Sequence, residues 1–102
     1  MDAFHALAEP RRRKVVEILA RRGKLSASQI CREFDVTPQA ISQHLRVLRE
    51  ANVLHMEKRA QRRLYALNPQ SMDQIQAWAT QMAGLWINRL NRLENALREE
   101  SA

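Results

Sequence analysis

The sequence predicts a mainly α-helical domain with one small β-hairpin, and three observations support this fold class. The chain has only 2 glycines and 3 prolines in 102 residues, whereas extended all-β folds need many more turn residues. Apolar residues recur at helical spacing over most of the chain, and only residues 53–67 alternate with period two. The length and the 45% hydrophobic content fit one soluble domain over residues 1–102.

Proline and glycine bound the first two expected helices. Phe4 and Leu7 indicate a short N-terminal helix that ends at Glu9, because the residue before a proline disfavours helical geometry. Pro10 is expected to open the second helix, since a proline at the first helical position costs little. Gly23 is then placed to end that helix as a C-terminal cap.

Residues 26–51 predict two short helices joined by a tight turn. Ser26 and Gln29 have the spacing of a capping box, so a helix is expected from Ser26 to about Phe34. Thr37, which a proline follows, is the expected N-cap of the next helix. Two short helices with so brief a connection must cross at a steep angle, which is the geometry of a helix-turn-helix.

The second of these helices has two different faces at about 100° of rotation per residue. Ile41, Leu45 and Leu48 share a narrow apolar face. The polar face carries Gln39, Ser42, Gln43 and Arg46, with His44 at the boundary between the two faces. Side chains of these types form hydrogen bonds with base edges or phosphates, although a solvated polar face is the simpler alternative.

Residues 53–67 predict two antiparallel strands, since apolar residues alternate there with polar neighbours. Four cations lie at the bend, namely Lys58, Arg59, Arg62 and Arg63. A hairpin with a cationic tip directly after a helix-turn-helix is typical of the wing of a winged helix. Such a tip can simply protect an edge strand, but four like charges repel one another without an anion. We therefore favour contact with phosphates or the minor groove.

The last third of the chain predicts one long helix over residues 70–99. Its N-cap is either Asn68, which Pro69 follows, or Ser71 in a capping box with Gln74. A continuous apolar stripe consists of Met72, Ile75, Ala79, Met82, Trp86, Leu90, Leu93 and Leu97. A stripe about 26 residues long reaches roughly 39 Å, which is more than a small domain covers by itself.

Part of this stripe is therefore expected to face a second copy of the chain, as a C-terminal dimerisation helix. The expected dimer interface consists of Phe4, Leu7, Met82, Trp86, Leu90 and Leu93. The alternative is that the helix packs back along the N-terminal helices of its own protomer. Trp78 and Trp86 are interpreted as core or interface residues and not as a ligand cage.

The charge indicates a class of partner, and the cysteine content excludes two kinds of site. The net charge of +6 divides into +7 for residues 1–67 and −1 for residues 68–102. A basic surface indicates a polyanion partner, nucleic acid before membrane, although many basic proteins are merely basic. The chain has no apolar run that could span a bilayer and no signal-peptide pattern, so a cytoplasmic location is expected. Cys31 is the only cysteine, which excludes an intrachain disulfide and a cysteine-based zinc site.

Two segments of the chain resemble the ArsR/SmtB family of bacterial winged-helix repressors. The first reads FHALAEPRRR over residues 4–13, and the second reads TPQAISQHLRVLREANVL over residues 37–54. The wing and its exit strand RRLYAL extend the resemblance over nearly the whole chain. The tail, with Trp78, Trp86 and Leu93, is similar to the autorepressor-type branch without metal sites.

Departures from the metal-sensing relatives support that branch. The resemblance places Ser26 and Ser28 where those relatives have a cysteine pair, and hydroxyls do not replace thiolates for soft metals. A second family site needs a histidine on the C-terminal helix, but no histidine follows His55. We expect no metal and no cofactor, and the effector that releases DNA is not implied by the family. Cys31 is interpreted as a small core residue and not as a redox sensor.

The sequence therefore predicts a homodimeric transcriptional repressor, not an enzyme, since no catalytic motif is present. The partner is double-stranded DNA with an inverted-repeat operator, and the chain's own promoter is the first expected site. The expected DNA-binding residues are Thr37, Gln39, Ser42, Gln43, His44, Arg46, Lys58, Arg59, Arg62 and Arg63. The alternative is a winged-helix module that binds an acidic protein. RNA is disfavoured because the strands offer only Tyr65 for base stacking.

Overall fold

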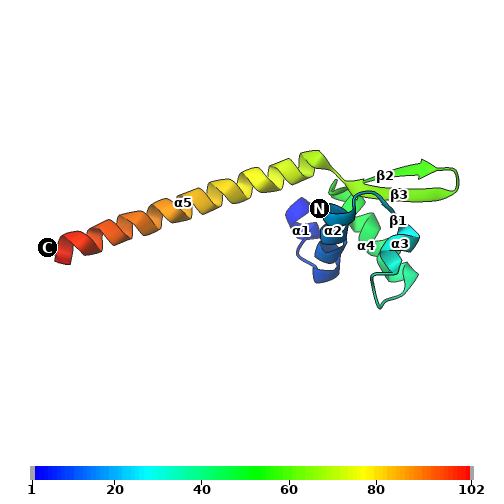
Figure 1. The fold of residues 1–102 in the computed structure, drawn as a ribbon, viewed down its shortest axis with the longest axis horizontal. Coiled ribbons are helices and arrows are strands. Elements are labelled where there is room, and N and C mark those ends of the chain that lie inside the picture. The colour runs from blue at the N-terminus through cyan, green and yellow to red at the C-terminus, as the bar shows by residue number, and fades with distance from the viewer. Residues whose placement is uncertain (1, 102) are drawn as a thin grey trace. The chain divides into compact units, whose positions relative to one another are not determined.

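A computed structural model describes residues 2–101, which form two compact units that divide between Met72 and Asp73 (Figure 1). The elements in chain order are α1 (Ala3–Ala6), α2 (Pro10–Arg22), β1 (Leu25–Ser26), α3 (Ala27–Cys31), α4 (Pro38–Glu50), β2 (Leu54–Arg59), β3 (Arg62–Leu67) and α5 (Pro69–Ser101). The first unit contains every element up to the start of α5, and the second unit is the rest of α5.

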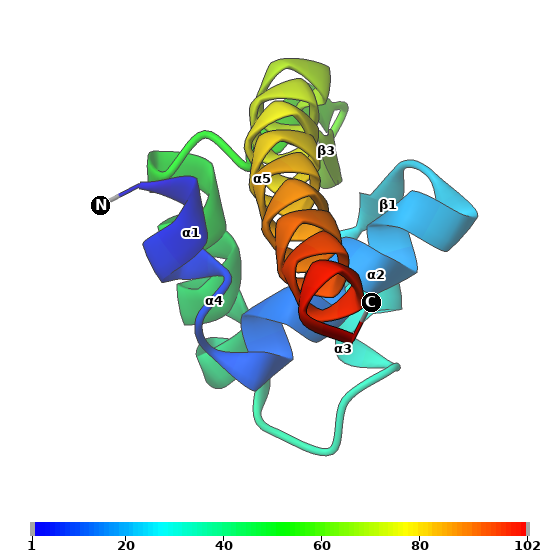
Figure 2. The ribbon, with the colours of Figure 1, turned by 90° about the vertical axis from the view of Figure 1, so that its left-hand side faces the viewer.

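Proline and glycine bound α2 as predicted, but the first helix was predicted to end at Glu9 and α1 ends at Ala6. The next hydrogen bond, from Ala8 N–H to the His5 carbonyl, spans only three residues, so the chain turns before Pro10. The Glu9 side chain accepts a hydrogen bond from the backbone N–H of Arg12 at 2.9 Å and forms the N-cap of α2. Gly23 ends α2 with φ of +79°, a left-handed conformation that glycine adopts without a steric penalty. The short helix α1 lies against α4 (Figure 2).

The capping box at the start of α3 is also confirmed. Gln29 N–H donates to the Ser26 hydroxyl at 3.2 Å, and Ser26 N–H donates to the Gln29 side chain at 2.9 Å. The predicted extension of this helix to Phe34 was wrong, because α3 ends at Cys31. After α3 the backbone hydrogen bonds span three residues and not four. Phe34 N–H, for example, donates to the Cys31 carbonyl, so this segment forms tight turns.

Helix α4 begins and ends with specific caps. The Thr37 hydroxyl accepts from Ala40 N–H at 3.2 Å. At the other end Asn52 has φ of +61°, and Val53 N–H donates back to the Leu48 carbonyl at 2.9 Å. This is a Schellman motif with asparagine in place of the usual glycine. The caps therefore set the length of the helix that presents the predicted polar face.

The hairpin is part of a three-stranded antiparallel sheet with the order β1-β3-β2. The expected wing had two strands, and the third strand is a correction. Leu25 pairs with Tyr65 and Ser26 pairs with Leu64, so two residues of β1 add to the edge of β3. A two-residue strand is too short to produce an alternating pattern in the sequence. The hairpin closes between Arg59 and Arg62, with Ala60 at φ of +56°.

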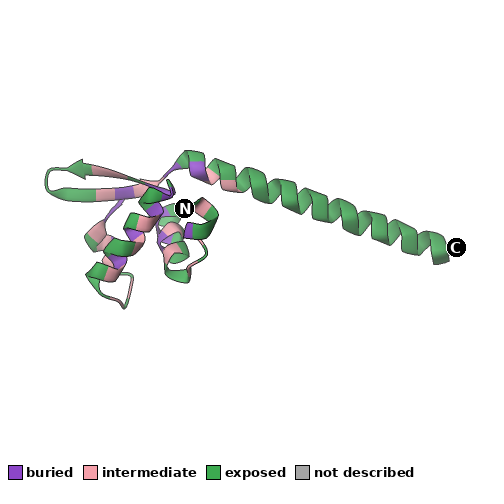
Figure 3. Cartoon of the chain, turned by 180° about the vertical axis from the view of Figure 1, so that it is seen from behind, coloured by how far each residue is buried: buried purple, intermediate pink, exposed green. Residues whose placement is uncertain are grey.

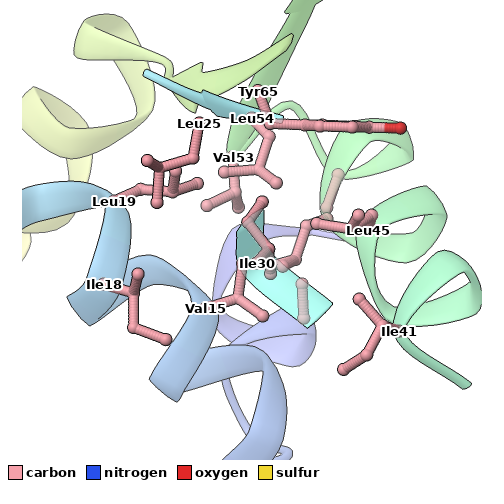
Figure 4. Packing of buried hydrophobic residues seen from close by; sticks show 13 residues of the cluster. Val15, Ile18, Leu19, Leu25, Ile30, Ile41, Leu45, Val53, Leu54 and Tyr65 are labelled. Carbon is pink, nitrogen blue, oxygen red and sulfur yellow. The ribbon is translucent and has the colours of Figure 1, made fainter. Parts of the chain in front are cut away.

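The core of the first unit lies between α2, α3, α4 and the sheet (Figure 4). It consists of Ala6, Val15, Ile18, Leu19, Leu25, Ile30, Ile41, Leu45, Leu48, Ala51, Val53, Leu54 and Tyr65. The apolar face predicted for α4 is therefore buried, and the opposite face of the same helix is exposed. Burial of one face decides which side chains of α4 are available to a partner.

Asn68 forms the N-cap of α5, because its side-chain oxygen accepts from Gln70 N–H at 3.1 Å. The alternative cap at Ser71 is not used, since that hydroxyl donates to the Asn52 carbonyl. Beyond Met72 the side chains of α5 are almost entirely exposed (Figure 3). No helix among the described residues is both long and apolar enough to cross a membrane.

Candidate nucleic-acid interface

The exposed face of α4 carries the four polar side chains predicted from the sequence, Gln39, Ser42, Gln43 and Arg46. Arg46 Nε lies 3.1 Å from Glu50 Oε1, one helical turn further along. Both side chains are largely exposed, so this pair is weak and solvent-screened. The guanidinium of Arg46 can therefore exchange its carboxylate partner for another anion.

Two predicted residues lie at the margins of this face. The exposed Thr37 uses its hydroxyl oxygen to cap α4, and a capping hydroxyl still has a proton to donate. His44 is half-buried, and its Nδ1 lies 3.8 Å from Oε2 of Glu9 at the start of α2. Partial burial raises the pKa of the Glu9 carboxyl, but the backbone N–H of Arg12 and the charge of His44 outweigh it, so the pKa is lower than usual.

The four wing cations, Lys58, Arg59, Arg62 and Arg63, are all exposed at the closed end of the hairpin. Arg59 Nε lies 2.8 Å from Glu57 Oε1, and Lys24 Nζ lies 3.1 Å from the same oxygen. The hydrogen bond and charge of Lys24 are the main reason that the pKa of Glu57 is lowered, with Arg59 adding to the effect. Arg59 is thus held by the protein itself, whereas no described carboxylate pairs with the other three cations.

A cationic cavity of about 360 Å³ lies between α4 and β3. Its lining residues are Ser42, Arg46, Arg49, Glu50, Arg63 and Tyr65. Arg49 is not among the DNA-binding residues predicted from the sequence. A signal was available, since Arg49 follows Arg46 by three residues and Ser42 by seven, which places all three on one side of the helix.

A second cavity of about 370 Å³ adjoins the first and shares Ser42, Arg63 and Tyr65 with it. Its other walls are mostly apolar and include Cys31. The Cys31 thiol is free and half-buried, and it packs against the hydrophobic core. This position fits the interpretation of Cys31 as a small packing residue.

The residues considered for metal binding are dispersed. Among the described residues, no three His, Cys, Asp or Glu side chains gather where they could hold a metal ion. Ser26, which stands at one position of the cysteine pair in metal-sensing relatives, is buried and uses its hydroxyl in the capping box of α3.

The residues predicted for a dimer interface fall into both units. On α5, Trp86, Leu90 and Leu93 are 58%, 44% and 58% exposed, and Met82 is exposed as well. In the first unit, Phe4 is exposed, whereas Leu7 is half-buried and packs partly against the core. These α5 side chains form an exposed apolar surface on the second unit, of the kind that marks interaction sites in proteins.

A short helix with an exposed polar face, set behind a tight turn and beside a cationic hairpin, defines the class of winged helix-turn-helix DNA-binding domains. Residues 7–57 match the family model described as a helix-turn-helix domain. The match includes α2, α3, α4 and the first half of the hairpin.

Relatives with similar sequences narrow the class to one family. The transcriptional repressor SdpR of Bacillus subtilis is 28% identical over 94% of this chain and 98% of the relative. The HTH-type transcriptional regulator Rv2034 of Mycobacterium tuberculosis is 34% identical over 86% of this chain and 78% of the relative. A crystal structure of an ArsR family transcriptional regulator superimposes with a TM-score of 0.71 at 28% identity, covering 81% of this chain and 84% of that one. The chain belongs to the ArsR family of transcriptional regulators, as its resemblance predicted.

Proposed function

We propose that the protein is a homodimeric repressor that binds an inverted-repeat operator, with α4 of each protomer in the major groove. The observation that carries this proposal is the exposed polar face of α4 beside three wing cations, Lys58, Arg62 and Arg63, that pair with no described carboxylate. Two copies place their α4 helices on one face of the duplex, so the half-sites lie about one turn, 34 to 36 Å, apart. SdpR, which matches the chain over nearly its full length, is itself a transcriptional repressor.

The proposal divides the side chains into base readers and phosphate binders. Gln39, Ser42 and Gln43 read base edges, because amide and hydroxyl groups both donate and accept hydrogen bonds. The backbone of the flanking DNA is contacted by Thr37, His44, Arg46, Lys58, Arg59, Arg62 and Arg63. Since Glu57 already holds Arg59, the contribution of Arg59 is the smallest of the four wing cations.

The dimer is proposed to form through α1 and α5. The exposed apolar side chains of α5 support it, because a single soluble protein rarely leaves so long an apolar surface uncovered. The interface residues are Phe4, Leu7, Met82, Trp86, Leu90 and Leu93. The chain belongs by this proposal to the autorepressor-type branch, whose members have no metal site.

Two substitutions separate base reading from phosphate binding. Gln43→Ala is expected to weaken binding to the operator by about 1 to 3 kcal/mol and to leave random DNA nearly unaffected. Arg62→Ala is expected to weaken both alike and to reduce the salt dependence. The measurement is fluorescence anisotropy at several salt concentrations, with an operator found by footprinting, starting with the chain's own promoter. Equal losses on operator and random DNA for Gln43→Ala would refute the base-reading role.

A further inference from the structure

Two different elements direct arginines into the cationic cavity between α4 and β3. Arg46 and Arg49 come from α4, and Arg63 comes from β3. Arg63 and Tyr65 are two residues apart on one strand, so both face the same side, where the buried Tyr65 contributes to the wall of the cavity. Arg62 faces the opposite side of β3 and does not line this cavity.

The charges in this cavity are not balanced by the protein. Glu50 is the only carboxylate among the described residues that line it, and Glu50 pairs with Arg46. Among the residues that the structure describes, no carboxylate lies within ion-pair distance of Arg49 or Arg63. Guanidinium groups in one concave site repel one another unless an anion joins them, and their planar forks match the oxygens of a phosphate.

We propose that this cavity binds a single phosphate of the DNA backbone, which Arg49 and Arg63 share. The inference rests on the proposed function and adds Arg49 to its DNA-binding residues. One phosphate would then contact both α4 and the wing. The docking of α4 in the major groove and the docking of the wing on the backbone are then coupled.

Sharing of one phosphate is tested by a double-mutant cycle on a random-sequence duplex, which needs no operator. Arg49→Ala and Arg63→Ala are each expected to weaken binding about tenfold. Each single variant is expected to change the slope of log K against log salt by much less than about 0.9, the value for one phosphate, because the remaining arginine still neutralises that phosphate. The double variant should lose about 0.9, which is more than the sum of the two single losses, because the phosphate then has no cation. In the control pair, Arg49→Ala with Arg62→Ala, the two slope changes should simply add, because Arg62 does not line this cavity.

Further variants distinguish a failure of the shared phosphate from a failure of DNA binding as a whole. In the Arg63→Ala background, Arg49→Lys retains the charge and is expected to keep most of the salt slope that Arg49→Ala loses. Arg21→Ala, at an exposed position on α2, controls for net charge. Additive losses for Arg49 and Arg63, or unchanged binding by a folded Arg49→Ala variant, would overturn the shared phosphate alone. If the wild-type protein binds no duplex even at low salt, the proposed function itself fails.

Discussion

The junction between α4, β2 and α5 offers a quantitative test, because two donors share one acceptor there. Asn68 Nδ2 donates to the Asn52 carbonyl at 2.9 Å, and the Ser71 hydroxyl donates to the same oxygen. Asn68 also caps α5 through Gln70 N–H. Asn68 and Ser71 are both buried. The carbonyl thus retains one hydrogen bond when either side chain is removed, and loses both only when the two are removed together.

The structure gives the size of each effect. Asn68→Ala removes a helix cap, worth about 1 kcal/mol, and one partly buried hydrogen bond, worth about 1 kcal/mol more. The expected loss of about 2 kcal/mol lowers the melting temperature by roughly 8 to 16 °C. Ser71→Ala is expected to cost about 1 kcal/mol. The double variant should lose about 1 kcal/mol beyond the sum, because the Asn52 carbonyl is then unsatisfied.

The free energy of unfolding is measured by urea denaturation, followed by far-ultraviolet circular dichroism, for the four members of the cycle. Asn91→Ala, at an exposed position further along α5, is the control and should change the stability by less than about 0.5 kcal/mol. If the losses of unfolding free energy for Asn68→Ala and Ser71→Ala simply add, the reasoning is refuted. Additive losses would mean that the two side chains do not stabilise the protein through one shared carbonyl.

Two further predictions concern the dimer and the wing. Leu90→Asp is expected to convert the dimer to monomers, as measured by sedimentation velocity, because it places a charge in the apolar interface. The control Asn91→Asp, on the polar face of α5, should remain dimeric. A dimeric Leu90→Asp variant would exclude this interface. Ala60→Gly should stabilise the protein by about 0.5 to 1 kcal/mol in thermal denaturation, since Ala60 has φ of +56°. Ala66→Gly, in the extended strand β3, should instead destabilise it by about 0.5 to 1 kcal/mol, and a matching loss for Ala60→Gly would contradict this account.

Local signals in the sequence predicted most of the elements, because helix caps join residues only a few positions apart. The capping box of Ser26 and Gln29 and the cap at Thr37 are both present. The alternating pattern of residues 53–67 likewise predicted the hairpin, because one of its faces packs on the core. The predicted polar face of α4 is likewise exposed, because the apolar face of this amphipathic helix packs on the core.

The sequence also left one local choice open, between Asn68 and Ser71 as the cap of α5. Both residues match a capping pattern, so no local signal separates them. In the tertiary structure Asn68 is the cap, because the Ser71 hydroxyl instead donates a hydrogen bond to the Asn52 carbonyl at the end of α4. Asn52 itself reaches that position only through the left-handed turn that ends α4.

The sequence by itself determined where α2, α3 and α4 begin, the buried face of α4 and the cationic tip of the hairpin, because each depends on neighbours in the chain. Only the tertiary structure decided that Leu25 and Ser26 form a third strand, and that Arg49 and Arg63 line the same cavity. Both results depend on strand β3 packing against segments distant in the sequence. Periodicity assigns a side chain to a face of its own element, but it does not say which other element that face meets.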